Sequence, residues 1–596
     1  MKPPVWRDDH IYAAPDDPAI EAAFQEAARA LTRLDALLAD LPDPAHPVAD
    51  ANALRHLLRA IRREANGVKS LAWNSQVYGY NRLSQNGRDE EARVLLSRGQ
   101  QLEATLAQRS KPVDLFWVRA PKSLVRTLLQ DPELFELAYH IHHDRAQQDQ
   151  WLSLESEQLI EGLAVDGLQA WGDLYDSLVG RLSPRVEGEI MGLAQADNLL
   201  SHPDRARRAH AWHGIQAAWA GEQETVAAIL NAINGWRNEL TTQRGKERLL
   251  DALDVSCHQG HLERRTLEIL MGEADAHKEL GRRALRAMAS AQGIDDFAPW
   301  DLYAPPPATS SVAISLAEAL RLVADAFESF DPEMGAFVHL MAERGWIDAY
   351  PSEHRRSGAY CTEYAHPAEP RVFMTFEGTL DNVITLAHEL GHAWHSWLLR
   401  ELPLEQRDYP MTLAETASLF AETLVREALL ARMETREQRR DIAWMDGERA
   451  ASMLLDIPSR FAFERALVAA RGEGYVGASQ LRVMMKSAKE QWYGDSLCQY
   501  DELFWASKGH FSIAEFGFYN YPYLFGYLFS LGLHAQKERA GGDFVEAYRA
   551  LLTDTGRMSA EDLVEKHLGV DIREPAFWQE SLRQVEEAVV RLERLV

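Results

Sequence analysis

The spacing of apolar residues predicts a protein built mostly of α-helices. Three long intervals lack proline and are rich in Ala, Leu, Glu and Arg, which favour helices; they span residues 48–111, 204–298 and 411–457. Apolar residues also recur at the three-to-four-residue spacing of amphipathic helices. The segments with this spacing are 17–40, 50–65, 85–110, 131–147, 150–182, 312–329 and 331–345. Strands and helices do not alternate, so the predicted fold class is mainly α.

One short region departs from the helical pattern and predicts a β-hairpin. Residues 358–364 and 371–377 are rich in residues that favour strands, and the segment 365–370 between them contains two prolines. The hairpin leads directly into a helix through Gly378 and Thr379. An edge strand beside that helix would be able to hydrogen-bond an extended peptide, although a small sheet with only a structural role fits equally well.

The helix after the hairpin has one apolar face and one polar face, and the polar face carries His-Glu-x-x-His. An α-helix turns about 100° per residue, so His388 and His392 lie about 40° apart, one turn from each other. Both imidazoles can therefore bind one ion, while Glu389 flanks that ion without binding it. This arrangement is typical of a zinc hydrolase, in which a carboxylate activates a water molecule. The alternative is a surface helix whose polar face happens to carry histidines.

A catalytic zinc ion usually has three protein ligands, and the next predicted helix offers two candidates for the third. Glu415 lies 27 residues after His388 and is the expected ligand. Glu422 shares its helix face and is either the alternative ligand or a partner that orients an imidazole. Thr412 and Glu415 also fit a helix capping box, which would give Glu415 a purely structural role. We expect His395 to line the cleft rather than to bind metal.

Peptide hydrolysis also needs hydrogen-bond donors for the oxyanion, and the C-terminal part of the chain offers them. Tyr519, Tyr523 and Tyr527 recur every four residues, close to His510. Tyrosine hydroxyls donate hydrogen bonds while remaining neutral near pH 7. The same spacing also fits an aromatic stripe that packs in a core.

Charge and composition indicate which classes of binding partner and which cellular location to expect for the protein. The formal net charge of −27 over 596 residues argues against nucleic acid or an anionic membrane surface as a partner. No apolar run reaches the length of a membrane span, and the first residues lack the apolar run of a signal peptide. The three cysteines form neither a metal-binding pattern nor a disulfide framework. We therefore expect a cytoplasmic protein.

Several motifs occur in a fixed order over residues 350–535, and together they resemble the oligoendopeptidase F family of zinc metallopeptidases, relatives of thimet oligopeptidase. The motifs are Arg356–Cys361, Thr375–Thr379, His388–His392, Ala414–Ser418, Phe518–Tyr523 and Phe525–Phe529. The resemblance implies a mainly helical fold in which two lobes enclose a deep central channel, with a small sheet beside the zinc helix. We expect an N-terminal helical lobe at 1–190 and a catalytic domain at 191–596.

The resemblance also implies roles for individual residues. One zinc ion would be bound by His388, His392 and Glu415, with Glu389 as the general base. A histidine and tyrosines would contact the substrate and the oxyanion. His510 matches that histidine, and the candidate tyrosines are Tyr519, Tyr521, Tyr523 and Tyr527.

These observations predict a zinc-dependent endopeptidase that hydrolyses internal bonds of short, unstructured peptides. One alternative is an exopeptidase similar to a carboxypeptidase on the same scaffold, which would need a charged group to hold a substrate terminus. The other is a non-catalytic helical protein that binds peptides. The presence of both a potential base and three potential ligands favours an enzyme.

Overall fold

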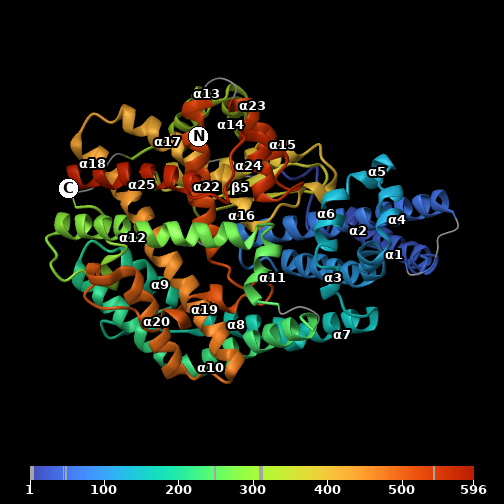
Figure 1. The fold of residues 1–596 in the computed structure, drawn as a ribbon. Coiled ribbons are helices and arrows are strands. Elements are labelled where there is room, and N and C mark those ends of the chain that lie inside the picture. The colour runs from blue at the N-terminus through green and yellow to red at the C-terminus, as the bar shows by residue number, and fades with distance from the viewer. Residues whose placement is uncertain are drawn as a thin grey trace.

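Helices form nearly all of the regular structure in the computed structural model of the protein (Figure 1), so the mainly α fold class is confirmed. The structure describes residues 6–44, 46, 50–246, 250–307, 313–352, 354–540 and 544–596. The first helices are α1 (Pro18–Ala39), α2 (Ala51–Gln85), α3 (Glu90–Arg119), α4 (Lys122–Leu128), α5 (Pro132–Phe135), α6 (Ala138–Arg145), α7 (Leu154–Ala164), α8 (Ala170–Arg181) and α9 (Leu193–Asn198). The central helices are α10 (Arg205–Arg244), α11 (Ala252–Gln259), α12 (Arg264–Gln292), α13 (Leu316–Phe330), α14 (Pro332–Arg344), α15 (Leu380–Leu399) and α16 (Met411–Ala414). The last helices are α17 (Thr416–Arg432), α18 (Arg436–Ala451), α19 (Ile457–Glu473), α20 (Ala478–Tyr493), α21 (Phe504–Ser507), α22 (Tyr521–Ala540), α23 (Phe544–Thr553), α24 (Ala560–Leu568) and α25 (Pro575–Leu595).

The N-terminal helices α1, α2 and α3 lie side by side at the right of Figure 1. Each is capped at its N-terminus by an aspartate whose side chain accepts a hydrogen bond from a backbone N–H of the first turn; these residues are Asp17, Asp50 and Asp89. Helices α2 and α3 approach closely at Gly79, where a Cβ atom would lie 2.8 Å from the Ala92 carbonyl oxygen. Glycine at this position therefore allows the close contact.

The helix boundaries differ from the sequence-based expectation in several places. The expected helix at 131–147 is two short helices, α5 and α6, and α3 continues beyond the expected end at residue 110. Helix α2 continues 20 residues beyond the expected end at residue 65, although this extension contains residues that favour helices weakly. Packing against α3 supplies the stabilisation that local preference lacks. The expected helix at 150–182 is instead α7 and α8, joined by a π-helical turn at Val165–Gln169.

The two largest hydrophobic cores are formed by different sets of helices, and helices α8, α10, α19 and α20, which contribute to the second, lie below the long helix α12 in Figure 1. The larger one joins α12 to α13, α15, α17, α22 and α25. The second packs Tyr175 of α8 with Trp219 of α10, Phe463 of α19 and Leu481 of α20. This second core joins residues on both sides of position 190, and the division of the chain into two domains at that position stays a prediction.

A three-stranded sheet packs beside α15 and confirms the predicted hairpin. Strands β4 (Tyr360–Glu363) and β5 (Pro370–Phe373) are antiparallel, with Tyr360 opposite Phe373. Strand β3 (Ile347–Asp348) pairs in parallel with β5, which gives the order β3-β5-β4 and leaves β4 at an edge. Strand β3 was not predicted because two residues are too short to show an alternating pattern. A separate two-stranded sheet consists of β1 (Arg185–Val186) and β2 (Glu189–Ile190).

Helix α22 lies in the larger core. Its residues Leu524, Phe525, Leu528 and Phe529 are fully buried, and α22 packs against α17 and α25. Within the described ranges, no helix has both the length and the apolar character that a membrane crossing requires.

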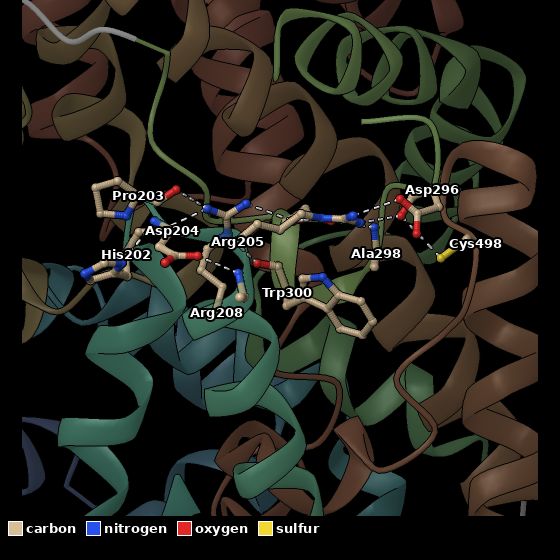
Figure 2. A network of polar contacts seen from close by, with 11 residues as sticks. His202, Pro203, Asp204, Arg205, Arg208, Asp296, Ala298, Trp300 and Cys498 are labelled. Atoms are coloured by element: carbon tan, nitrogen blue, oxygen red, sulfur yellow. Dashed lines mark hydrogen bonds and ion pairs between the residues drawn. The ribbon is translucent and has the colours of Figure 1, made fainter. Parts of the chain in front are cut away.

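A buried ionic network holds the start of α10 against the 3₁₀ turn Pro299–Asp301 (Figure 2). The fully buried carboxylate of Asp301 accepts hydrogen bonds from Arg205 at 2.8 Å and from Arg208 at 2.8 Å. The backbone N–H of Ala298 donates a further bond to it at 3.1 Å. Each charge in the network has a partner, and this compensates for the cost of burying it.

We predict that Asp301→Ala lowers the free energy of unfolding by about 3–5 kcal/mol, because it leaves the buried guanidinium of Arg208 without its charged partner. Asp296→Ala is the matched control. It also removes a partner of Arg205, but its side chain is 69% exposed, so we expect a loss of less than about 1 kcal/mol. Thermal and urea unfolding of both variants would measure this difference. Equal losses would contradict the role assigned to the buried network.

Candidate active site

Helix α15 is capped at its N-terminus by Thr379, whose hydroxyl accepts a hydrogen bond from the backbone N–H of Asn382. Its apolar residues are buried, and His388 and His392 project together from another face, as the helical spacing predicts. Their Nε2 atoms lie 3.1 Å apart, and their rings are nearly perpendicular. The two imidazoles therefore converge on one point.

Glu415 meets this pair from the junction between α16 and α17. Its Oε2 atom lies 3.4 Å from His388 Nε2 and 3.5 Å from His392 Nε2. The hydroxyl of Ser418 donates a 2.7 Å hydrogen bond to the same oxygen. Gly526 of α22 lies behind Glu415, where a Cβ atom would come within 2.8 Å of the Glu415 Cβ.

The geometry of these three residues fits a metal ion. Ligand atoms about 2.0–2.2 Å from a tetrahedral ion lie roughly 3.3–3.6 Å from one another. The contacts among His388, His392 and Glu415 are close to that spacing. Among the residues that the structure describes, this is the group of three histidine, cysteine or acidic side chains suited to holding an ion.

The capping-box alternative for Glu415 is wrong. The hydroxyl of Thr412 donates to the carbonyl oxygen of Gly260 at 2.6 Å, and α16 has no side-chain cap. The side chain of Glu415 instead faces the two imidazoles.

Glu422 lies behind the site and contacts the other nitrogen of His388. Its Oε1 atom is 2.8 Å from Nδ1 of that ring, which fixes the proton on Nδ1 and leaves the Nε2 lone pair available for a metal ion. Arg426 and Arg449 each bind the Glu422 carboxylate at 2.8 Å. Burial opposes ionisation of Glu422, but Arg449 and Arg426 hold its pKa well below the usual range. Glu422 is therefore placed to orient His388.

Glu389 follows His388 on α15 and is only 5% exposed. Burial raises the pKa of its carboxyl to about 7, although the charge of His388 opposes this shift. A carboxyl group with a pKa near neutral can both accept and release a proton, which suits a general base.

On the C-terminal segment, His510 is held in one protonation state by its neighbours. The Oδ1 atom of Asn520 lies 2.8 Å from His510 Nδ1 and also accepts a hydrogen bond from Arg460 at 3.2 Å. Because this oxygen only accepts, Nδ1 carries the hydrogen and Nε2 carries the lone pair. Burial, together with the positive charge of Lys508, lowers the pKa of His510 to about 4, so its ring is neutral at pH 7.

The four candidate tyrosines are placed differently. Tyr523 stacks on the ring of His510 with centroids 5.6 Å apart, and Tyr519 packs edge-on against that ring at 4.9 Å. Burial raises the pKa of Tyr523, and the neighbouring Tyr519 adds to this shift. Tyr523 lies three residues before Gly526, which packs against Glu415, so it lies on the side of α22 that faces the metal residues. Tyr519 comes before the first residue of α22, so the spacing of four residues is not a continuous helical stripe.

The other two tyrosines do not join this group. Tyr521 is fully buried, and its hydroxyl donates to the carbonyl oxygen of Ser256 at 3.1 Å. Tyr527 lines a separate cavity of about 330 Å³ together with Glu422 and Arg426. The structure thus brings together His510, Tyr519 and Tyr523 and places Tyr521 and Tyr527 elsewhere.

The expectation that His395 lines the cleft is wrong. The residue is completely buried, stacks on Tyr409, and its Nε2 atom lies 2.8 Å from the hydroxyl of Thr555. His395 is three residues beyond His392, and this additional rotation takes it into the packed interior.

Sequence reasoning missed several residues that support the site. Arg426 lies four residues after Glu422, and that spacing could have indicated the pair. Arg449, Arg460 and Asn520 have no comparable signal, because their partners lie on distant segments.

Comparison with known proteins agrees with this geometry. A family model described as Peptidase family M3 matches residues 198–584, and one described as Oligopeptidase F matches residues 117–183. Group B oligopeptidase PepB from Streptococcus agalactiae is 26% identical over 489 residues, which cover 79% of this chain and 78% of the relative.

Solved structures show the same fold. A putative peptidase from Chlamydophila abortus has a TM-score of 0.80 and 19% identity, covering 99% of this chain and 98% of that one. Oligoendopeptidase-F from Enterococcus faecium has a TM-score of 0.70 and 18% identity, covering 97% of each chain. Since the first family model matches well over half of the sequence and includes all three potential metal ligands, the chain belongs to peptidase family M3 and is a metalloendopeptidase similar to oligoendopeptidase F.

Proposed function

We propose that the protein is a zinc-dependent endopeptidase that hydrolyses internal bonds of short oligopeptides, with Glu389 as its general base. The observation that carries this proposal is the convergence of the donor atoms of His388, His392 and Glu415 beside the buried Glu389. Two imidazoles and one carboxylate form the ligand set of a catalytic zinc site that keeps one position open. When bound there, zinc would polarise a carbonyl group and lower the pKa of a water molecule to about 7.

The residues around this site supply the proton transfers. Glu389 accepts a proton from the attacking water and donates it to the amine that leaves after the peptide bond breaks. Glu422, held by Arg426 and Arg449, keeps His388 in the orientation and tautomer that metal binding needs.

The opposite wall offers one neutral donor and one acceptor. The hydroxyl of Tyr523 is the donor that we assign to the oxyanion, because this tyrosine stacks on His510 and lies on the side of α22 that packs against Glu415. Neutral His510 presents the lone pair of Nε2, so it accepts a hydrogen bond from a substrate N–H instead of stabilising the oxyanion.

Short peptides are the proposed substrates. The relative from Streptococcus agalactiae is named an oligopeptidase, and the edge strand β4 beside α15 can pair with an extended peptide. A channel between two lobes, as the family resemblance implies, would admit such peptides and exclude folded proteins.

The decisive experiment is mass spectrometry of the products formed from a ladder of unstructured peptides of graded length. We expect internal cuts that are confined to the shorter peptides.

Glu389→Gln should lower kcat by about 10²–10⁴ while keeping its metal, because only the base is removed. Stepwise loss of residues from one end would instead show an exopeptidase, and near-normal turnover by Glu389→Gln would contradict the mechanism.

Metal analysis of purified variants tests the proposed ligands. Glu415→Ala should lose most of its zinc, whereas Glu422→Ala should bind zinc about 10–100-fold more weakly, because it removes only the partner of His388. Glu427→Ala is the matched control, since this residue of α17 faces His534 instead of the site. Zinc titration against a chelating dye would give the affinities. An unchanged metal content in Glu415→Ala would contradict the assignment of Glu415 as a metal ligand.

Single hydroxyl deletions test the oxyanion donor. We expect Tyr523→Phe to lower kcat by about 10²–10³ with little change in KM, because the donor acts mainly in the transition state. Tyr519→Phe removes a hydroxyl from the same aromatic group and should have a smaller effect. A larger loss of kcat in Tyr519→Phe would transfer the role to that residue.

A further inference from the structure

A cavity of about 650 Å³ adjoins the proposed active site and has no part in the chemistry described so far. It is lined by Asp381 in the first turn of α15 and by Lys508, two residues before His510. Other walls come from helices α10, α12, α18 and α20, and in Figure 1 α18 lies above α12 while α10 and α20 lie below it. The volume falls in the range of pockets that hold small ligands.

The cavity lies within reach of a peptide bound at the metal site. Asp381 precedes His388 by seven residues, which corresponds to roughly 10 Å along the helix axis. An extended peptide covers about 3.3 Å per residue, so three substrate residues would span this distance. Arg426 and Arg449 line the same cavity and hold the Glu422 that contacts His388. A substrate cleaved at the metal site can therefore extend into this cavity.

Lys508 is the cation in this cavity whose charge is not compensated by a direct partner. Lys489 donates a hydrogen bond to Asp456, and the two arginines bind Glu422. Lys508 is partly buried, and no acidic side chain in the described part of the chain forms an ion pair with it. Removing an ammonium group from water is costly without a partner, so a ligand that supplies a negative charge would be favoured here.

The surroundings of Lys508 strengthen this preference. Arg460 and Lys489 lie close enough to influence it, and both donate to the single carboxylate of Asp456. Burial and the charge of Arg460 lower the pKa of Lys508 to about 8, so the ammonium is still mostly protonated at pH 7. The carboxylate of Asp501 is occupied by Gln216 and by the backbone N–H of Leu503.

Two acidic residues of the cavity are influenced by cations other than Lys508. Asp381 and Glu448 are influenced by Arg426 and Arg449, whereas Lys508 is influenced by Arg460, Asp456 and Lys489. Around Lys508 the cavity is lined by Lys489, Asp456 and Asp501, and the nearby Arg460 adds a further positive charge.

We propose that Lys508 is a specificity residue whose ammonium group binds a carboxylate of the peptide substrate. The carboxylate belongs either to the C-terminus of a short peptide or to an Asp or Glu side chain. This inference rests on the proposed function, because it names the chemistry of the substrate that the site would prefer. It also supplies the charged group that an interaction with a substrate terminus requires.

Matched peptide pairs test this preference. One pair differs only in a C-terminal carboxylate or amide, and the others replace Glu by Gln at single positions on each side of the cut. We expect the wild-type protein to cleave the carboxylate member of one type of pair with a kcat/KM about 10- to 100-fold higher, because a charge-assisted hydrogen bond is lost in the neutral member. The pair that shows the difference identifies the source of the carboxylate.

Three variants assign the effect to Lys508. Lys508→Met keeps much of the aliphatic chain and should abolish the difference within the pair, whereas Lys508→Arg should retain part of it. Lys486→Met is the matched control, because Lys486 pairs with Glu502 and lies outside this cavity. Thermal unfolding checks that the variants are folded, and Lys508→Gln replaces Lys508→Met if the latter is not.

Binding measurements separate this inference from the proposed function. Fluorescence anisotropy of the same labelled pairs, with Lys508 intact or replaced in a Glu389→Gln background, reports the carboxylate preference without hydrolysis. If no peptide is cleaved, the proposed function fails, and anisotropy still decides the role of Lys508. Equal affinity and turnover for both members of every pair would overturn the inference. So would a preference that persists in Lys508→Met, or a preference for the neutral member of a pair.

Discussion

The candidate active site depends on the close approach of α15 and α17. A Cβ atom at Gly391 would lie 2.7 Å from the Cα of Ser418 and 2.8 Å from the carbonyl oxygen of Ala417. Such distances are too short for a real side chain, so only glycine at position 391 lets the two helices come this close. Their approach brings Glu415 within 3.5 Å of both imidazoles. Gly391 of the His-Glu-Leu-Gly-His motif thus helps to position Glu415, the third potential ligand, because it allows α17 to pack close to α15.

Behind the potential ligands lie buried charged side chains, at a place where apolar side chains would cost less free energy to bury. Glu422 is 4% exposed, and its carboxylate binds two arginines and His388. Removing these ions from water is unfavourable, and their pairing compensates only when every partner is present. The arrangement instead fixes the ring of His388 and the position of its proton. The network therefore contributes mainly to the precision of the site.

The two walls of the site have opposite electrostatic character. The wall formed by α15 and α17 carries the carboxylates of Glu389 and Glu415, whereas Lys508 and Arg460 of α19 place positive charge near His510. A cationic environment and burial both keep His510 neutral, which separates its role from that of a tyrosine donor. A peptide between these walls would meet proton-accepting groups on one side and positive charge on the other.

The sequence by itself determined the features that depend on residues close together in the chain. The four-residue spacing placed His388 and His392 on one helix face, and the strand-forming residues before that helix indicated the hairpin, because helical and strand geometry are local. The motifs of residues 350–535 also sufficed to indicate the family. Only the tertiary structure distinguished Glu415 from Glu422. The sequence predicts one face for both, but the helix is interrupted at Glu415, and packing decides which carboxylate reaches both Nε2 atoms. It also showed that Tyr523 lies at the site whereas Tyr521 and Tyr527 do not, and that His395 is buried. These outcomes depend on contacts between segments that lie tens to hundreds of residues apart, and no local spacing encodes such contacts.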